Sequence, residues 1–472
     1  MKIRIQLLLP GILLAFFAMA QPGPTPASDR MKVRDQNNAL VERSLVSEVP
    51  FQAIGPTIFS GRVVDIDVSP TDPSHFYVAY ASGGLWKTEN NGTSFKPLFD
   101  HEDVISIGDV AVDWSRNIIW LGSGENNSSR SSYAGNGIYK STDNGKTWQF
   151  MGLPESQHIG RIILDPKNPD HVVVAVLGHL YSPNPERGVY MTTDGGKTWQ
   201  QTLFVDDNAG AIELIQEPGK SNILYAATWH RERRAWNFVE AGKGSGIYKS
   251  TNGGKTWTLL TTEASGFPTG DGVGRIGMDA VRMGNQLYLY AIVDNYNRRP
   301  KDEKEDQEAL TKAKIKELSK EDFLNLKDKT LKKFLSDNRF PAKYTVQTVK
   351  SMVRQDKIVP AALAEYLEDA NALLFDTEVI GAEVYLSTDA GKTWKKTHES
   401  YLDGLFYSYG YYFGQIRIAP QNPQQLYVLG VPVLRSDDGG KNWSSIDGDN
   451  VHSDHHALWA DPNRAGHLIL GN

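Results

Sequence analysis

Cysteine is absent from the 472-residue sequence, which excludes disulfide bonds, thiol catalysis and a lipid-modified cysteine at a processing site. Positive charge is not in excess either. The formal net charge is −6, which gives no reason to expect nucleic acid as a partner. Glycine and tyrosine are plentiful, with 43 and 20 copies, and this composition suits turn-rich β structure.

The N-terminus has the pattern of a secretory signal peptide. Lys2 and Arg4 form a charged start, Leu7 to Met19 are mostly apolar, and an A-x-A cleavage site follows. The alternative, a membrane anchor, would need a longer apolar run. We therefore predict that residues 1–20 are removed and that residues 21–49 form a flexible leader. The mature protein would be secreted or periplasmic, with no stable membrane insertion after signal removal.

An eight-residue pattern, S-x-D-x-G-x-T-W, recurs along the chain. Its aspartate or asparagine can accept backbone N–H bonds within a tight turn. Its glycine supplies a positive φ, and its tryptophan begins an outgoing strand with a large apolar face to bury. The copies are STDNGKTW from Ser141, TTDGGKTW from Thr192, STNGGKTW from Ser250, STDAGKTW from Ser387, SDDGGKNW from Ser436 and a degraded TENNGTSF from Thr88.

The spacing of these copies predicts an architecture. They begin at residues 88, 141, 192, 250, 387 and 436, so the gaps are 53, 51, 58, 137 and 49 residues. A period of roughly 40–50 residues with several short strands per unit is typical of a β-propeller. We predict an all-β, seven-bladed β-propeller over residues 50–472, its last blade incomplete. An N-terminal strand at Phe51 to Pro56 is expected to close that last blade.

The gap of 137 residues indicates an insertion near residues 299–376. Apolar side chains there recur at helical spacing, for example at Leu318, Phe323 and Leu326. The sequence therefore predicts a small α-helical insertion within blade 5, after its second strand. Two roles stay open for it: a solvated decoration packed on the propeller, or a lid or partner-docking module.

The repeats are Asp-box (BNR) repeats, and the sequence around them resembles the sortilin/VPS10-type, glycosidase-like propeller proteins of bacteria. The resemblance covers about residues 50–472 and implies ligand binding by the propeller without chemistry. The stretches that carry it are SGGLWKT from Ser82, SIGDVAVD from Ser106, GHLYSPNPERGVY from Gly178, GSGIYKST from Gly244 and VHSDHHALWADP from Val451.

Strand direction places the variable loops on one face. In an up-and-down blade, the Asp boxes share a lower face, and the second-to-third loops and the connections between blades share an upper face. Aromatic, arginine, asparagine and histidine side chains there suit a peptide, protein or glycan ligand, although such residues can also fill gaps between blades. The predicted ligand-binding residues are Glu125, Asn126, Arg130, His179, Tyr181, Arg187, Trp229, His230, Arg231, Trp236, Tyr411, His452 and His455.

The innermost strands are expected to line a central channel with charges of mixed sign. Arg161 would have acidic neighbours and could be neutralised within the protein, so a structural charge belt is favoured over ligand recognition. The predicted channel ring is Asp65, Asp109, Arg161, Glu213, Arg275 and Gln415.

Enzyme hypotheses find weak support in the sequence. A sialidase needs converging arginines, and Arg62 falls out of register with the others. A two-propeller, xyloglucanase-like hydrolase needs paired carboxylates flanking the bond. Ala81 occupies the position of that family's aspartate, which leaves Glu125 and Asp454 as weak catalytic candidates.

Metal binding is the last chemical hypothesis. His452, Asp454 and His456 are of suitable ligand types, but a satisfied hydrogen-bonding cluster is favoured, so we predict no metal and no cofactor. The favoured function is an exported Asp-box β-propeller that binds a peptide, protein or glycan on its upper face. The alternative is a glycoside hydrolase of the two-propeller type or an inactive relative.

Overall fold

A computed structural model describes residues 24–46, 49, 61–127, 132–234, 237–300, 310–337, 340, 343–366, 379–407 and 409–472. Four sequence predictions lie outside these residues: the signal peptide at 1–20, the closing strand at Phe51 to Pro56, and the candidates Arg130 and Trp236.

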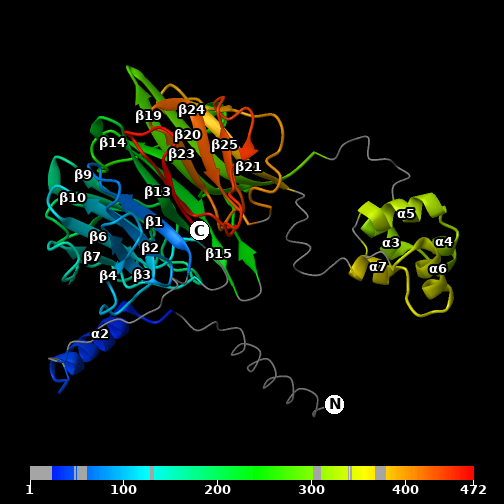
Figure 1. The fold of residues 1–472 in the computed structure, drawn as a ribbon, viewed down its shortest axis with the longest axis horizontal. Helices are drawn as coiled ribbons and strands as arrows, with labels where there is room; N and C mark the ends of the chain where they lie inside the picture. Colours follow the sequence, from blue (N-terminus) through cyan, green and yellow to red (C-terminus); the bar gives the residue numbers. More distant parts are fainter. Residues whose placement is uncertain are drawn as a thin grey trace, which may run out of the picture.

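Six four-stranded antiparallel sheets follow one another along the described chain, and each is a propeller blade (Figure 1). Blade 1 contains β1 (Val63–Val68), β2 (Phe76–Tyr80), β3 (Gly84–Thr88) and β4 (Lys96–Pro97). Blade 2 contains β5 (Ile107–Asp113), β6 (Ile118–Ser123), β7 (Ile138–Ser141) and β8 (Gln149–Phe150). Blade 3 contains β9 (Ile159–Asp165), β10 (Asn168–Val176), β11 (Gly188–Thr192) and β12 (Gln200–Leu203).

The second half of the propeller repeats this order. Blade 4 contains β13 (Ala209–Glu217), β14 (Lys220–His230), β17 (Gly246–Ser250) and β18 (Thr258–Leu259), with a small hairpin, β15 (Glu232–Arg233) and β16 (Phe238–Val239), after β14. Blade 5 contains β19 (Val273–Met283), β20 (Gln286–Arg298), β21 (Val379–Ser387) and β22 (Lys395–Lys396), preceded by the 3-10 turn η1 (Glu263–Ser265). Blade 6 contains β23 (Gln415–Ala419), β24 (Asn422–Leu429), β25 (Val433–Ser436) and β26 (Ser444–Ser445).

The expectation of seven blades is wrong for the described residues, which form six blades. The last two strands, β27 (Ala457–Ala460) and β28 (Leu468–Gly471), make a two-stranded sheet. β27 packs between β23 and β1, and the Val63 N–H donates to the Asn472 carbonyl at 3.2 Å. Within the described residues, this two-stranded sheet therefore joins blade 6 to blade 1.

Apolar side chains of neighbouring blades interlock to form the core. Ile159 and Val174 of blade 3, for example, lie in one buried cluster with Trp120 and Ile138 of blade 2. The middle strands are buried on both faces, so β2 (Phe76–Tyr80) is buried along its whole length. Packing of successive sheets face to face is what bends the row of blades into a ring.

Each Asp box closes the turn between the third and fourth strands of its blade. In blade 2, the Asp143 carboxylate accepts the Thr147 N–H at 2.9 Å and the Thr147 hydroxyl at 2.6 Å. The Ser141 hydroxyl accepts the Gly145 N–H at 2.8 Å. Gly145 has φ of 83°, a conformation that a side chain would strain. The predicted roles of the aspartate and the glycine of the motif are thus visible in these contacts.

The tryptophan of the box ties its blade to the preceding one. The Trp148 indole N–H donates to the Leu98 carbonyl at 2.7 Å, and its ring meets the Phe99 ring edge-on at 5.0 Å. Glu125 precedes β7 and the box follows it, so they lie at opposite ends of one strand. The boxes therefore occupy the face opposite the candidate ligand loops.

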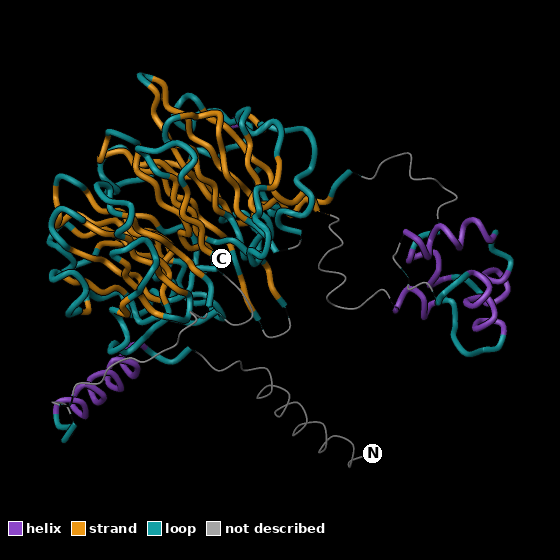
Figure 2. Tube along the Cα trace, in the orientation of Figure 1, coloured by secondary structure: helices purple, strands orange, loops and turns teal. Residues whose placement is uncertain are grey.

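The described residues between β20 and β21 form five helices that share a core of their own: α3 (Lys312–Glu317), α4 (Lys320–Leu324), α5 (Asp328–Asp337), α6 (Val346–Arg354) and α7 (Ala361–Tyr366). Phe323, Leu331 and Val349 are fully buried within it. Figure 2 shows these helices set apart from the sheets. The apolar side chains of these helices therefore pack against one another.

The leader contains a helix, α2 (Ala27–Glu42), where the sequence predicted a flexible segment over 21–49. Its first turn carries Asp29, whose negative charge favours a helix start, whereas Pro26 at the N-cap position makes no capping hydrogen bond. No side chain of α2 is buried. The contacts that hold it to the propeller come from residues far away in the sequence, so the local composition could not indicate it.

Candidate functional site

The upper face centres on an ion pair between Arg62 and Glu125. Glu125 follows β6, at the start of the loop to β7, and its side chain is fully buried. Arg62 Nε donates to Glu125 Oε1 at 2.7 Å, and a second guanidinium nitrogen contacts the same oxygen. The Arg62 guanidinium also lies over the Tyr412 ring at 5.2 Å. Three segments far apart in the sequence thus meet around one cation.

Burial raises the pKa of Glu125, and the neighbouring Arg62 guanidinium opposes that rise. Within the described residues, Glu125 Oε2 is buried without a hydrogen-bond partner. The pKa of Asp454, nearby on the connection that precedes β27, is also raised by burial. Both carboxyl groups that the sequence proposed as weak catalytic candidates are therefore easier to protonate than free side chains.

A second buried polar network lies beside this pair. Arg275 Nη1 donates to Asn127 Oδ1 at 2.7 Å, and Asn127 Nδ2 lies 3.4 Å from His456 Nδ1. The His456 ring stacks on the Phe413 ring with centroids 5.2 Å apart. Burial lowers the pKa of His456 well below its ordinary value, so this histidine is neutral at physiological pH.

The ion pair opens onto a cavity of about 610 Å³ at the mouth of the upper face. The side chains in its lining that can make charged, polar or aromatic contacts with a ligand include Arg62, Tyr412, His452 and Asp454. The last residues of the chain, at 470–472, line it as well. A cavity of roughly 300–1,000 Å³ with a few convergent polar groups is the usual form of a ligand site.

Four of the six predicted channel-ring residues, one arginine and three carboxylates, form a single cluster of paired charges. Arg161 lies between three carboxylates, with 2.7 Å to Asp109, 2.9 Å to Glu213 and 3.2 Å to Asp65. The Asp109 carboxylate also accepts the Ile162 N–H at 2.7 Å, which links blades 2 and 3. These contacts fit a structural belt, because the charges are used within the protein.

The two remaining ring candidates lie elsewhere. Arg275 turns toward Asn127 and away from Arg161, and the buried Gln415 begins β23. Burial lowers the pKa of Arg275 to about 10, which still leaves it charged at neutral pH.

Several predicted ligand contacts on blades 3 and 4 are buried and hold the loops together. Arg187 is 1% exposed and donates to the carbonyls of Asn208 at 2.6 Å and His179 at 2.7 Å. Trp229 is 0% exposed, and its indole N–H donates to the Glu240 carbonyl at 2.8 Å.

Other candidates in these loops differ in their surroundings. Arg231 is fully buried, and its guanidinium lies 5.4 Å from the Trp229 ring centre. Asn126 Nδ2 donates to the carbonyl oxygens of Gly108 and Gly160, which fixes it between blades. His230 is half-buried, and Tyr181 is exposed.

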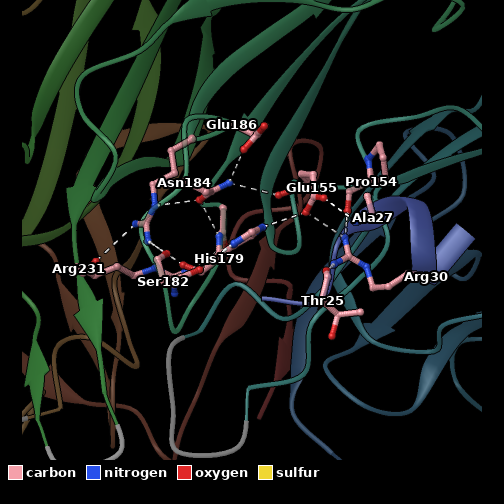
Figure 3. Close-up of polar contacts among 12 residues, drawn as sticks. Thr25, Ala27, Arg30, Pro154, Glu155, His179, Ser182, Asn184, Glu186 and Arg231 are labelled. Atoms are coloured by element: carbon pink, nitrogen blue, oxygen red, sulfur yellow. Dashed lines mark hydrogen bonds and ion pairs between the residues drawn. The ribbon is translucent and has the colours of Figure 1, made fainter. Parts of the chain in front are cut away.

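Figure 3 shows the blade 3 loop, where His179 meets an unexpected partner. His179 Nε2 lies 3.1 Å from Glu155 Oε2, and His179 Nδ1 lies 2.9 Å from the Ser182 hydroxyl. Glu155 also accepts contacts from the leader helix. Glu155 was not among the sequence candidates, and nothing in its local sequence, LPESQ, distinguishes it from any surface glutamate.

The metal candidates do not form a metal site. Across the described residues, no three His, Cys, Asp or Glu side chains are grouped to hold an ion. His452 is exposed, whereas His456 is buried against aromatic rings. His455 is buried and lies 3.5 Å from Asp447. The three histidines therefore have separate surroundings.

Tyr411, another ligand candidate, packs its ring edge-on against Phe238 of the small blade 4 hairpin, with centroids 4.9 Å apart. Its neighbour Tyr412 is the residue that reaches the cavity. Arg62 entered the sequence reasoning only through the sialidase comparison. The pairing of Arg62 with Glu125 spans 63 positions, and no local pattern could have indicated it.

The fold and its turns define an Asp-box β-propeller, and comparison with known proteins agrees. The BNR/Asp-box repeat model matches residues 385–396, which is the box of blade 5. The Sortilin-Vps10 model, described as sortilin, neurotensin receptor 3, matches residues 136–359. The chain is similar to the sortilin/Vps10-type Asp-box propellers over these residues, and the resemblance inferred from the repeats is confirmed.

Three characterised proteins share sequence with the chain. A xyloglucanase of Paenibacillus sp. is 24% identical over 239 residues, which are 45% of this chain and 22% of that protein. The vacuolar protein sorting/targeting protein 10 of Kluyveromyces lactis is 31% identical over 141 residues, 28% and 8% of the two chains. The photosystem II assembly lipoprotein Ycf48 of a Synechococcus strain is 24% identical over 184 residues, 36% and 48%.

Among solved structures, the GH74 xyloglucanase of Xanthomonas campestris superimposes with a TM-score of 0.53 at 14% identity. The match covers 90% of this chain and 52% of that one. The likeness shows the propeller fold alone. The chain spans less than half the length of the characterised relatives that it matches. Within the described residues, no helix combines the length and apolar character needed to cross a membrane.

Proposed function

We propose that this protein is a binding module, which captures a peptide, protein or glycan in the cavity of its upper face. The observation that carries the proposal is the cavity of about 610 Å³ lined by Arg62, Tyr412, His452 and Asp454. Its walls come from the two ends of the propeller ring, where β28 lies beside β1. Such a seam offers side chains from several segments to one ligand.

The chemistry of this cavity suits recognition. Arg62 is held in place by Glu125 beneath it, and 24% of its side chain remains exposed. Tyr412 supplies an aromatic face, while Asp454 and His452 supply polar groups at the rim. An aromatic face with directional polar groups is the combination that peptides and sugars require.

Export belongs to the same proposal. Cleavage after Ala20 would release a mature chain into the periplasm or the medium, where the absence of cysteine avoids unwanted oxidation. The helical insertion within residues 299–376 is proposed as a separate folding unit on the binding module, because its apolar side chains cluster with one another.

Binding can be tested with two defined probes: xyloglucan oligosaccharides, and peptides selected from a random display library. We expect the full-length protein to bind one class, with affinity measured by titration calorimetry. Tyr412→Ala and Asp454→Asn should each weaken that binding at least tenfold. Lys146→Ala, an exposed change in the blade 2 box on the lower face, serves as the control and should leave affinity unchanged. Equal affinities for all three variants, or no binding of either probe, would refute the proposal.

Glycoside hydrolysis remains the second candidate, and one observation favours it. The pKa values of Glu125 and Asp454 are both raised by burial, and Arg62 acts electrostatically on both groups. A general acid requires a raised pKa. Release of reducing ends from xyloglucan that is abolished by Glu125→Gln or Asp454→Asn would support hydrolysis, whereas binding without release would support the module.

A further inference from the structure

The leader helix α2 makes its hydrogen bonds to the propeller at the connection between blades 2 and 3 (Figure 3). The Ala27 N–H donates to Glu155 Oε1 at 2.7 Å. Arg30 Nη2 donates to the Pro154 carbonyl at 2.6 Å and lies 3.2 Å from Glu155 Oε2. One carboxylate therefore receives both a backbone N–H and a guanidinium from the same helical turn.

His179, in the loop that follows β10 of blade 3, positions the Glu155 carboxylate. His179 Nε2 lies 3.1 Å from Glu155 Oε2 and must donate, since an ionised carboxylate only accepts. The Ser182 hydroxyl, 2.9 Å from His179 Nδ1, orients that ring. The acceptor is thus held by blade 3 and does not depend on the helix, which is the arrangement expected of a preformed binding group.

The helix itself is weakly held. None of its side chains is buried, and its last turns carry the exposed apolar residues Leu40 and Val41. Besides the Glu155 contacts, Arg34 lies 4.5 Å from the ring centre of Phe150. Contacts of this kind near the surface contribute little each, so docking of α2 is an equilibrium that a competitor can shift.

A cavity of about 270 Å³ opens beside the docking point. It is lined by apolar groups, with a carboxylate from Glu155 and another from Glu186 at its edge: Leu153, Pro154, Glu155, Ser156, Glu186, Tyr190 and Trp199. No residue of α2 is among those lining it. An apolar pocket bordered by two carboxylates fits a peptide in which a basic side chain stands next to an apolar one.

We propose that this pocket binds a peptide segment carrying an arginine beside an apolar residue, with the arginine on Glu155, and that α2 competes for the same carboxylate from outside the pocket. The helix carries such a pair, Arg30-Met31, and its Arg30 contacts Pro154 and Glu155 of the pocket lining. The site lies between blades 2 and 3, away from the Arg62 cavity, and the inference does not rest on the function proposed for that cavity.

The test uses a fluorescent peptide with the sequence of residues 25–42, labelled at its C-terminal end, and full-length protein. Binding is followed by fluorescence anisotropy. The Ala27→Pro/Arg30→Ala double variant removes both contacts that α2 makes to Glu155, and proline is accepted in the first turn of a helix. Because a tethered competitor acts at high effective concentration, this variant should bind the peptide about tenfold more tightly than the wild type.

Three comparisons decide the outcome. Adding Glu155→Gln to the double variant should weaken binding of the peptide at least tenfold. A peptide with Arg30→Ala should bind at least tenfold more weakly than the native peptide, and a peptide with Lys32→Ala, whose side chain is mostly exposed, should bind as the native one does. Equal binding by wild type and double variant, or equal binding of the Arg30→Ala and native peptides, would overturn the proposal.

Discussion

Replacing Arg62 with alanine should destabilise the propeller by about 2–3 kcal/mol at pH 8. Loss of one member of a buried ion pair typically costs roughly 3–5 kcal/mol, because the other charge is left without compensation. Glu125 is fully buried, but 24% of the Arg62 side chain is exposed, and water can partly replace it, so we place the value below that range.

The dependence on pH follows from the direction of the Glu125 shift. Burial raises the pKa of Glu125 in the folded protein above its unfolded value. The folded state then binds the proton more readily, so ionisation of Glu125 reduces stability as pH rises through that interval. Removing Arg62 raises the pKa of Glu125 in the folded protein further, because the Arg62 charge opposes that rise. The loss of stability in the Arg62→Ala variant should therefore be large at pH 8 and smaller toward pH 5. Each unit by which the pKa of Glu125 rises corresponds to about 1.4 kcal/mol.

The measurement is urea unfolding followed by tryptophan fluorescence at pH 5 and pH 8. Glu125→Gln in the Arg62→Ala background should recover part of the lost stability and abolish the dependence of the deficit on pH. Arg116→Ala, which breaks the more exposed pair with Asp113, is the control and should cost less than about 1 kcal/mol. The reasoning fails if the Arg62→Ala deficit is the same at both pH values and Glu125→Gln does not reduce it.

Three further changes test the scaffold. Arg161→Met leaves three carboxylates without their cation and should cost about 3–5 kcal/mol in urea unfolding, a loss that Asp109→Asn should partly relieve. Asp143→Ala should speed hydrogen exchange at the Thr147 amide, whereas Asp143→Asn should not, because asparagine fills this role in blade 4 at Asn252. Phe323→Ala should lower only the melting transition of the helical insertion, by about 3–5 kcal/mol in stability, and calorimetry should show the propeller transition unmoved.

The pH dependence of the Asp box has the opposite sign to that of Glu125. Hydrogen bonds from Thr147 lower the pKa of Asp143 to about 2 in the folded protein. A carboxyl whose folded pKa lies below its unfolded value contributes stability at neutral pH, and this contribution is lost as pH falls toward 2. The boxes and the Arg62 site therefore respond to acid in opposite directions, which separates their contributions in one titration.

The sequence was informative wherever structure depends on neighbours in the chain. The box turns close within a few residues, so the pattern predicted their hydrogen bonds and their placement opposite the ligand loops. The helices of the insertion follow the apolar spacing for the same reason, with Phe323 in their core. The repeats did not predict the number of blades correctly. The last sheet contains two strands, and it contacts β1 through residues that belong to no repeat.

The candidate site was harder to predict because it depends on distant pairs. Glu125 was chosen for its place in an upper-face loop, but its partner Arg62 stands 63 positions away. The leader helix depends on Glu155, 128 positions from Ala27. The proline-rich composition before α2 favoured a flexible segment over the helix-start signal at Asp29, because composition does not report the distant residues that a segment contacts.

Arginine shows why residue type alone could not sort ligand contacts from scaffold. Arg187 donates mainly to carbonyl oxygens and is 1% exposed, so its charge is used at the ends of loops. Arg62 and Arg30 pair with carboxylates while part of each side chain stays in contact with solvent. An arginine fixed by a carboxylate at a cavity edge is both oriented and accessible. On this upper face, the partner of an arginine therefore predicts its role better than its position in a loop.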